Sequence, residues 1–455
     1  MNFDFHQLSL LLFSILIPVF LIWKSNSFFL VIYFCIALHL DILSVAKGEM
    51  NLTFLKFFSL VSIPFSLFRL YQNRSDTFVG TVGKKPLLFF AHLLFIFLLF
   101  AIIIPWEDKS GTRAIIDQSF MRSFRQLVTV CGEISLGYFI SFHILDIGLK
   151  KTLSILVYVC SFTFLGALAE LALQFDFYSF VSQGKPYLNE FRLRGFNYEP
   201  RGFANTMAIG CLYAFFSMNR LSFYFIAITL FCLGNYLATS MVGNILLIAS
   251  VPIYFLIAGL SKYKMINGLN GAGIKAILFA CVVTFSLFFN KIAPTFNYFN
   301  SDFLRSKILH ANDHLKERSY ISSQKNFIDK FEIHDAAALN FFYHNPQFLL
   351  TGVGLGTIGI ASSPYLIERD AKGWGYKSNN SPHMGAIFII SQYGVIGILI
   401  LGLIFFNRNM FNDLYQCTFL IALIGLWLLQ LRYGTPLIIA LLILNNAQSK
   451  PKTNE

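Results

Sequence analysis

Long apolar stretches make up most of the chain, and their length is the feature that most limits its fold. A stretch of about 17 or more apolar residues is long enough to cross the hydrocarbon layer of a membrane as a helix. About thirteen such stretches follow one another, at 8–23, 26–46, 50–70, 86–105, 127–149, 152–174, 202–219, 221–238, 241–260, 274–290, 384–406, 412–429 and 432–446. The sequence therefore predicts an all-α polytopic integral membrane protein with about 11 to 14 transmembrane helices.

The composition agrees with a membrane protein and argues against a nucleic-acid-binding one. Of 455 residues, 56% are hydrophobic and 13% are charged, whereas soluble proteins have about 25% charged residues. The net charge is +12, but the basic residues lie in short groups between apolar stretches, where they mark cytoplasmic loops or bind anionic lipid head groups. Nucleic acid is therefore excluded as a partner, and membrane lipids are expected instead. The seven cysteines all lie in apolar stretches without a CxxC pair, so neither a disulfide framework nor a metal site is predicted.

The basic residues of the short loops also divide the chain into regions. Lysine and arginine are retained on the cytoplasmic side, which places the loops around Arg74, Lys150 and Lys264 on that side and 106–126, 175–201 and the longest polar segment outside. We expect an N-terminal transmembrane bundle of about ten spans over 1–290, a large external loop over 291–382, C-terminal spans over 383–446 and a cytoplasmic tail over 447–455.

The external loop is expected to contain its own helix. From about Ser322 apolar residues recur at helical spacing, and the pattern ends where Asn345 precedes Pro346, which disfavours helix before it. The spacing predicts an amphipathic helix that lies on the membrane or caps a cavity, with His344 in a capping position. The segment TGVGLGTIG that follows lacks the lysine of a phosphate-binding P-loop, and we expect a tight turn folded against the membrane. His310, His314 and His334 are interpreted as solvated surface residues.

Arginines on the outer side are the first candidates for chemistry. Basic residues are usually enriched on the cytoplasmic side. The segment 175–201, which is predicted to be external, nevertheless contains Arg192, Arg194 and Arg201. A guanidinium group matches phosphate oxygens with two parallel hydrogen bonds. Pro200 suits the first turn of a helix, whose amides also favour an anion beside Arg201. The alternative is that these arginines extend to the membrane interface, paired with Glu199.

His383 is the second candidate. It follows Pro382 and opens the apolar stretch 384–406, so its imidazole is expected at the outer membrane boundary, where it can act as a general base. A structural role is the alternative. Further candidates for substrate binding are Glu199, beside these arginines, and, in the external loop, His344, Asn345, Arg305 and Arg318. Glu170 and the other polar residues inside apolar stretches either line a path, as in a transporter, or bond between helices.

Four motifs in a fixed order resemble one known family. They are RGFNYEPRGFA opening one span, LATSMVGNILLIA in a later one, HNPQFLLTGVGLG in the large loop and SPHMGAIFIISQYGVIG opening the next span. Together they resemble the O-antigen ligase/polymerase family, and the polymerase branch more than the ligase, over roughly 190–405. His383 matches the family histidine that activates the acceptor hydroxyl, and Arg201 with its neighbours matches the outer arginines. Met384 stands where the family usually has asparagine, and Tyr198, Glu199 and Pro200 stand where it usually has Gly-Asn-Pro.

The resemblance implies a glycosyltransferase that needs no cofactor and uses an undecaprenyl-pyrophosphate-linked glycan. The expected reaction is polymerisation of oligosaccharide repeat units into O-antigen or a related surface polysaccharide, in the biosynthesis of lipopolysaccharide, at the periplasmic face of the bacterial inner membrane. The large loop is then periplasmic, and a chain-length regulator protein fits as a further partner. Two alternatives stay open: an O-antigen ligase that transfers the glycan to lipid A core, and a flippase that transports the lipid-linked oligosaccharide.

Overall fold

The computed structural model of the chain is helical in nearly all of the part that it describes. That part comprises residues 31, 44–46, 52–72, 85–106, 119–173, 195, 200–217, 220–238, 277–282, 284, 333–365, 382 and 385–405. The all-α class predicted from the sequence is confirmed for these residues.

One group of helices contains α3 (Phe54–Gln72), α5 (Lys85–Leu98), the π-helical turn η2 (Leu99–Ile103) and α6 (Ser119–Ile147). Helix α3 packs along α6. The approach is close because Gly132 of α6 lies against Ser59, where a Cβ atom would stand 3.2 Å from the backbone carbon of that residue. Ser66 Oγ also donates a hydrogen bond to the carbonyl oxygen of Ser135 at 2.9 Å. Small residues therefore let the two helices meet along their backbones.

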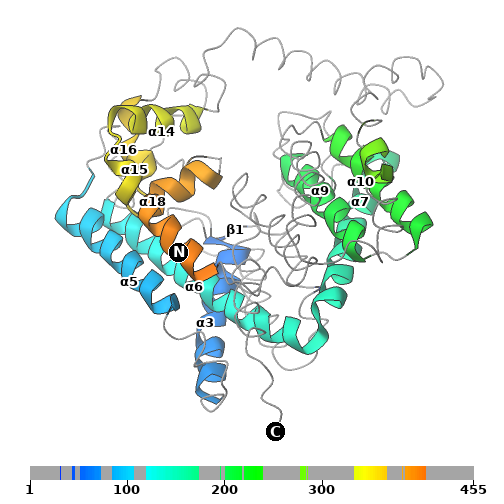
Figure 1. The fold of residues 1–455 in the computed structure, drawn as a ribbon, viewed down its shortest axis with the longest axis horizontal. Helices are drawn as coiled ribbons and strands as arrows, with labels where there is room; N and C mark the ends of the chain where they lie inside the picture. Colours follow the sequence, from blue (N-terminus) through cyan, green and yellow to red (C-terminus); the bar gives the residue numbers. More distant parts are fainter. Residues whose placement is uncertain are drawn as a thin grey trace, which may run out of the picture.

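A second group contains α7 (Leu149–Leu173), α9 (Pro200–Ser217) and α10 (Leu221–Leu237), which pack side by side (Figure 1). Glycines again define the contacts, since Gly210 of α9 faces the ring of Phe231 and Gly234 of α10 faces Met207. Gly148, with a φ of +83°, separates α6 from α7, and its amide bonds to the carbonyl of Ile144 at 2.8 Å. A positive-φ glycine of this kind is the usual end of a helix.

The third group is built from the end of the predicted external loop and the helix after it. It contains α14 (Ile333–His344), α15 (Phe348–Thr351), α16 (Ile358–Ala361), the 3-10 turn η7 (Ser363–Tyr365) and α18 (Gly385–Phe405). Figure 1 shows α14, α15 and α16 gathered near α5 and α18. Helix α15 packs on α18, and α18 packs on α5, so this group and the first share one body.

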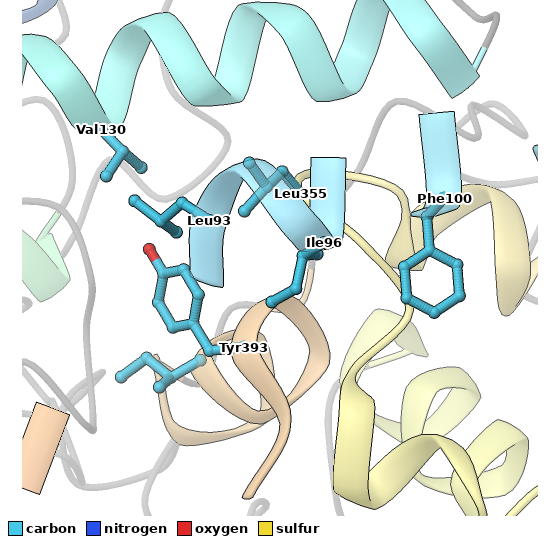
Figure 2. Packing of buried hydrophobic residues seen from close by; sticks show 7 residues of the cluster. Leu93, Ile96, Phe100, Val130, Leu355 and Tyr393 are labelled. Atoms are coloured by element: carbon cyan, nitrogen blue, oxygen red, sulfur yellow. The ribbon is translucent and has the colours of Figure 1, made fainter. Parts of the chain in front are cut away.

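A buried apolar cluster joins these elements. The cluster contains Leu93 and Ile96 of α5 and Phe100 of η2 (Figure 2). These side chains cluster with Val130 of α6, with Tyr393 of α18 and with Leu355, which lies between α15 and α16. Leu93 and Leu355 are fully buried. Since Leu355 belongs to the glycine-rich segment predicted as a turn, this segment is part of the apolar core of the described structure.

Most predicted spans that fall on described residues are helices. The stretches 50–70, 86–105, 152–174, 202–219 and 221–238 correspond to α3, α5 with η2, α7, α9 and α10, and 277–282 and 284 are helical within 274–290. The stretches 8–23, 241–260, 412–429 and 432–446 lie outside the described residues. By length and composition, one described helical segment, the 20 residues Lys151–Glu170, is sufficient to cross a membrane, and Ala91–Ile103, Leu221–Leu237 and Gly385–Ile400 are shorter apolar helices.

Three predicted boundaries are wrong: the end of 26–46, the start of 50–70 and the start of 127–149. The stretch 26–46 does not stay helical to its end, because β1 (Ser44–Ala46) pairs antiparallel with β2 (Leu52–Thr53); β-branched Val45 and Thr53 suit this extended backbone. Helix α6 starts at Ser119 instead of 127, so 119–126 is helical and not a loop. Ser119 Oγ bonds to the carbonyl of Phe100 at 3.0 Å, which ties the first turn of α6 to η2.

The helix predicted in the external loop ends where expected, but it is not a surface amphipathic helix. Helix α14 ends at His344, directly before Asn345. Ala336, Ala337 and Ala338 are buried in succession together with Phe341 and Phe342, so burial extends around most of the helix. His334, expected to be solvated, is half-buried. The reason is that α16, η7 and α18 all pack against α14.

Candidate functional site

Gly195, which follows Arg194 in the sequence, is bound to α7 by a buried carboxylate. Glu170 is 4% exposed, and its Oε2 atom accepts a hydrogen bond from the amide of Gly195 at 2.7 Å. Gly195 has a φ of +53°, and a Cβ atom there would stand 3.0 Å from the carbonyl oxygen of Thr163. The backbone of Gly195 therefore lies directly on α7. The sequence left two roles open for Glu170, and the structure shows a bond to this glycine.

Arg201 stands in the first turn of the helix that follows. Helix α9 begins at Pro200, as its sequence predicts. Phe203, Ala204 and Met207 of the same helix are fully buried, which is consistent with the packing of α9 on α7 and α10. Arg201 is therefore near helix amides that have no partner within the helix and favour an anion.

The hydrogen bond between Gly195 and Glu170 predicts how the chain responds when the carboxylate is removed. In Glu170→Ala the amide of Gly195 loses its charged acceptor, which is worth about 1.5 to 3 kcal/mol. We expect trypsin to cleave the Arg194–Gly195 bond about tenfold faster or more, measured by mass spectrometry of the new peptide ends in purified protein. Glu170→Gln keeps an acceptor oxygen and is expected to show a smaller increase. Equal cleavage in Glu170→Ala and the unchanged protein would contradict this hydrogen bond.

The glycine-rich segment after α15 is held by hydrogen bonds on both sides of Val353. Its amide donates to the carbonyl oxygen of Ser391 in α18 at 2.7 Å, and its carbonyl accepts from the indole Nε1 of Trp106 at 2.8 Å. Thr357 Oγ1 donates to the same carbonyl. The tight turn predicted here is confirmed, with Gly352, Gly354 and Gly356 all at positive φ. It packs on other helices of the protein.

Helix α18 is interrupted beside this turn. Gly394 has φ 62° and ψ 177°, which breaks the helix into two parts. The break is next to Leu350 and Gly352, whose backbone atoms fill the space that a Cβ atom of Gly394 would need. His92 of α5 lies 3.2 Å from the carbonyl oxygen of Tyr393 through its Nε2 atom; a carbonyl only accepts, so that nitrogen carries the proton. The predicted span 384–406 is therefore two shorter helices.

Gln392, directly before the break, is a buried polar residue that the sequence analysis did not select. It is 1% exposed, and its Nε2 atom finds no hydrogen-bond partner in the part of the chain that the structure describes. One polar side chain does not change the apolar average of the stretch 384–406, so a search for apolar stretches did not single out Gln392.

His344 and Asn345 lie together at the end of α14. His344 Nδ1 bonds to the carbonyl oxygen of Asn340 at 2.9 Å, which is the capping role expected from its position. Asn345 Nδ2 donates to the carbonyl oxygen of Phe341 at 3.0 Å and to the hydroxyl of Tyr365 at 3.2 Å. Asn345 therefore connects α14 to η7.

Two arginines missed by the sequence analysis stand at the start of α6. Arg122 is 8% exposed, and Arg125 follows one helical turn later, before the apolar stretch 127–149 begins. Burial, together with the neighbouring guanidinium of Arg122, lowers the pKa of Arg125. The glycine-rich turn reaches this helix, since a Cβ atom of Gly356 would stand 3.3 Å from Gln126. A signal was present, because two arginines three residues apart within SFMRSFRQLV share one face of a helix.

The remaining candidates are not placed by the structure. His383, Arg192, Arg194, Glu199, Arg305 and Arg318 lie outside the described residues, although Pro382 directly before His383 is buried. Helix α9, with Arg201, packs on α7 and α10, whereas α18 packs on α5 and α15. From the sequence we also expect Arg201 and His383 to face one site, because each lies at the predicted outer end of a span, and this expectation stays a prediction.

Neither the models of known protein families nor the curated proteins include a match to this sequence.

Proposed function

We propose that the chain is a polytopic protein of a bacterial inner membrane that polymerises undecaprenyl-pyrophosphate-linked oligosaccharide repeat units at the periplasmic face. The observation that carries this proposal is the hydrogen bond from Val353 to Ser391. It joins two of the four motifs on which the resemblance to O-antigen polymerases rests, HNPQFLLTGVGLG and SPHMGAIFIISQYGVIG. Motifs that belong to one site are expected to pack together in this way.

A membrane location is supported by the outer surface of α7. Tyr158 is 72% exposed, Phe162 53% and Leu165 60%. They are spaced four and three residues apart, so they share one helix face, and this face is apolar. Lipid tails would cover such a face, whereas water would make it costly to expose. The resemblance and the other apolar stretches extend the proposal to many spans.

The proposed reaction is a transfer of a glycan between two lipid-linked units. A hydroxyl oxygen of the acceptor forms a bond to the anomeric carbon of the donor, and the bond from that carbon to the pyrophosphate oxygen breaks. Undecaprenyl pyrophosphate leaves with the bonding electron pair, and His383 takes the hydroxyl proton. Arg201, Arg192 and Arg194 stabilise the charge that develops on the leaving group, each by a few kcal/mol. The electrons and the proton balance without a cofactor.

The surface glycan of a strain that lacks the gene tests this function. We expect single repeat units on the lipid A core instead of a ladder in a silver-stained gel, with the ladder restored by the unchanged chain. A bare core with accumulated lipid-linked polymer would instead identify a ligase. Lipid-linked units stranded on the cytoplasmic face would identify a flippase.

A further inference from the structure

Three aromatic rings form an exposed surface at the end of α14, which we call the Tyr343 platform and define as Tyr343, His344 and Tyr365. Tyr343 is 76% exposed. Its ring centroid lies 5.3 Å from that of His344 at an interplanar angle of 83°. The His344 ring in turn stacks on Tyr365 at 5.2 Å and 26°. An exposed ring of this size is costly in water and is a common feature of binding surfaces.

The platform stands on a rigid base. Tyr365 packs edge-on against the buried ring of Phe341 at 6.1 Å, and its hydroxyl accepts a hydrogen bond from Asn345 Nδ2 at 3.2 Å. Pro346, directly after Asn345, fixes φ of the chain at the end of α14. Rings that are held before a ligand arrives lose little conformational entropy when they bind it.

Charge and hydrogen bonding indicate what kind of ligand suits this surface. From Ala336 to Tyr365 the sequence contains no Asp, Glu, Lys or Arg, so within this described stretch no lysine or arginine is present to bind a phosphate or an anionic head group. His344 Nδ1 faces the carbonyl oxygen of Asn340 at 2.9 Å and therefore carries a proton, which leaves Nε2 as an acceptor in the neutral ring. The surface thus combines aromatic ring faces with a hydrogen-bond acceptor.

A sugar ring has the complementary properties. Its carbon-bound hydrogens carry partial positive charge and are attracted to the negative face of an aromatic ring. Its hydroxyl groups, at the edge of the ring, can donate to an acceptor such as His344 Nε2.

We propose that the Tyr343 platform is a sugar-binding subsite, at which Tyr343 stacks on a sugar ring of the acceptor glycan and His344 Nε2 accepts a hydroxyl hydrogen bond. This subsite rests on the proposed function, because it holds the acceptor oligosaccharide of that transfer. The arginines bind the pyrophosphate in the proposed reaction, whereas the platform binds the sugar itself.

Binding to the purified, full-length chain in nanodiscs tests the subsite separately from activity. The probe is the polysaccharide that mild acid releases from the surface glycan of the same bacterium. In Tyr343→Ala we expect the dissociation constant to rise about tenfold. Tyr343→Phe keeps the ring and is expected to bind like the unchanged protein. Tyr343→Leu keeps an apolar side chain without a ring and is expected to bind like the alanine variant.

The same variants, returned to the deletion strain, should restore the ladder at normal protein levels but shift it to fewer repeat units for Tyr343→Ala and Tyr343→Leu. Unchanged binding in Tyr343→Ala would overturn the subsite, and so would full binding in Tyr343→Leu, which would show an apolar or lipid contact. If the unchanged chain restores no ladder, the proposed function fails instead, and the binding comparison still decides whether the platform takes sugar.

Discussion

Gly394→Ala is expected to remove most of the folded protein from the membrane. Gly394 has φ 62° and ψ 177°, a region that essentially only glycine adopts. A Cβ atom would overlap the carbonyl oxygen of Leu350 and stand 2.6 Å from the amide nitrogen of Gly352. Backbone strain and overlap together cost about 4 kcal/mol or more, which is a large part of the stability of an ordinary protein. The measurements are the amount of full-length chain in membranes and its thermal unfolding in detergent.

Gly148→Ala is the matched control for this variant. Gly148 also has a positive φ, +83°, but a Cβ atom there meets nothing within 4 Å. The control therefore carries backbone strain of about 1 to 2 kcal/mol without overlap, and we expect it to fold at a moderately reduced level. If the two variants behave alike, the close packing of the helix break on Leu350 is wrong.

The apolar pattern was sufficient to predict the helices but not all of their ends. Where a local rule operates, the predicted end holds, as at Pro200 in α9 and before Asn345 in α14. Counting apolar residues placed the start of α6 too late, because Arg125 and, one turn earlier, Arg122 interrupt the apolar run. The structure buries Arg122 within the helix, and hydropathy has no means to represent a charged side chain that is buried.

The break in α18 shows a limit of a different kind. The stretch around Gly394 is apolar and of spanning length, so nothing local separates it from a continuous helix. Its conformation depends on the backbone of Leu350 and Gly352, which lie more than forty residues earlier in the chain. A contact between such distant segments leaves one trace in the sequence, a glycine, and glycines in membrane helices have several other uses.

The candidate site was predicted unevenly for the same reason. Glu170 was recognised as a polar residue in costly surroundings, but its partner, Gly195, is 25 residues away and bonds through the backbone. The residue type of such a partner carries no signal. By contrast, His344 caps the helix that contains it, and this local role followed from its position before Asn345 and Pro346.

His383→Ala is expected to abolish the polysaccharide ladder while leaving the protein level normal. If the imidazole removes the proton of the acceptor hydroxyl, its loss lowers the rate by about 100- to 10,000-fold. The measurement is the silver-stained glycan ladder of the complemented deletion strain, with the chain quantified in membranes in parallel. His314→Ala, in the predicted external loop, is the control and should restore a full ladder. A full ladder from His383→Ala would contradict the role of His383 as the general base.

Two variants of Arg201 test in the same assay whether the positive charge is sufficient or the planar geometry of the guanidinium group is also needed. Lysine keeps the charge but replaces the planar fork by a single ammonium group, so Arg201→Lys should lose most of the ladder if the guanidinium binds the pyrophosphate in two parallel hydrogen bonds. Arg201→Ala should lose at least as much. Full ladders from both variants would contradict the binding of the pyrophosphate by Arg201, and other guanidinium groups would then be the candidates. Arg122 and Arg125 would then be the next pair to replace, because they stand one turn apart beside the glycine-rich turn that is bonded to α18.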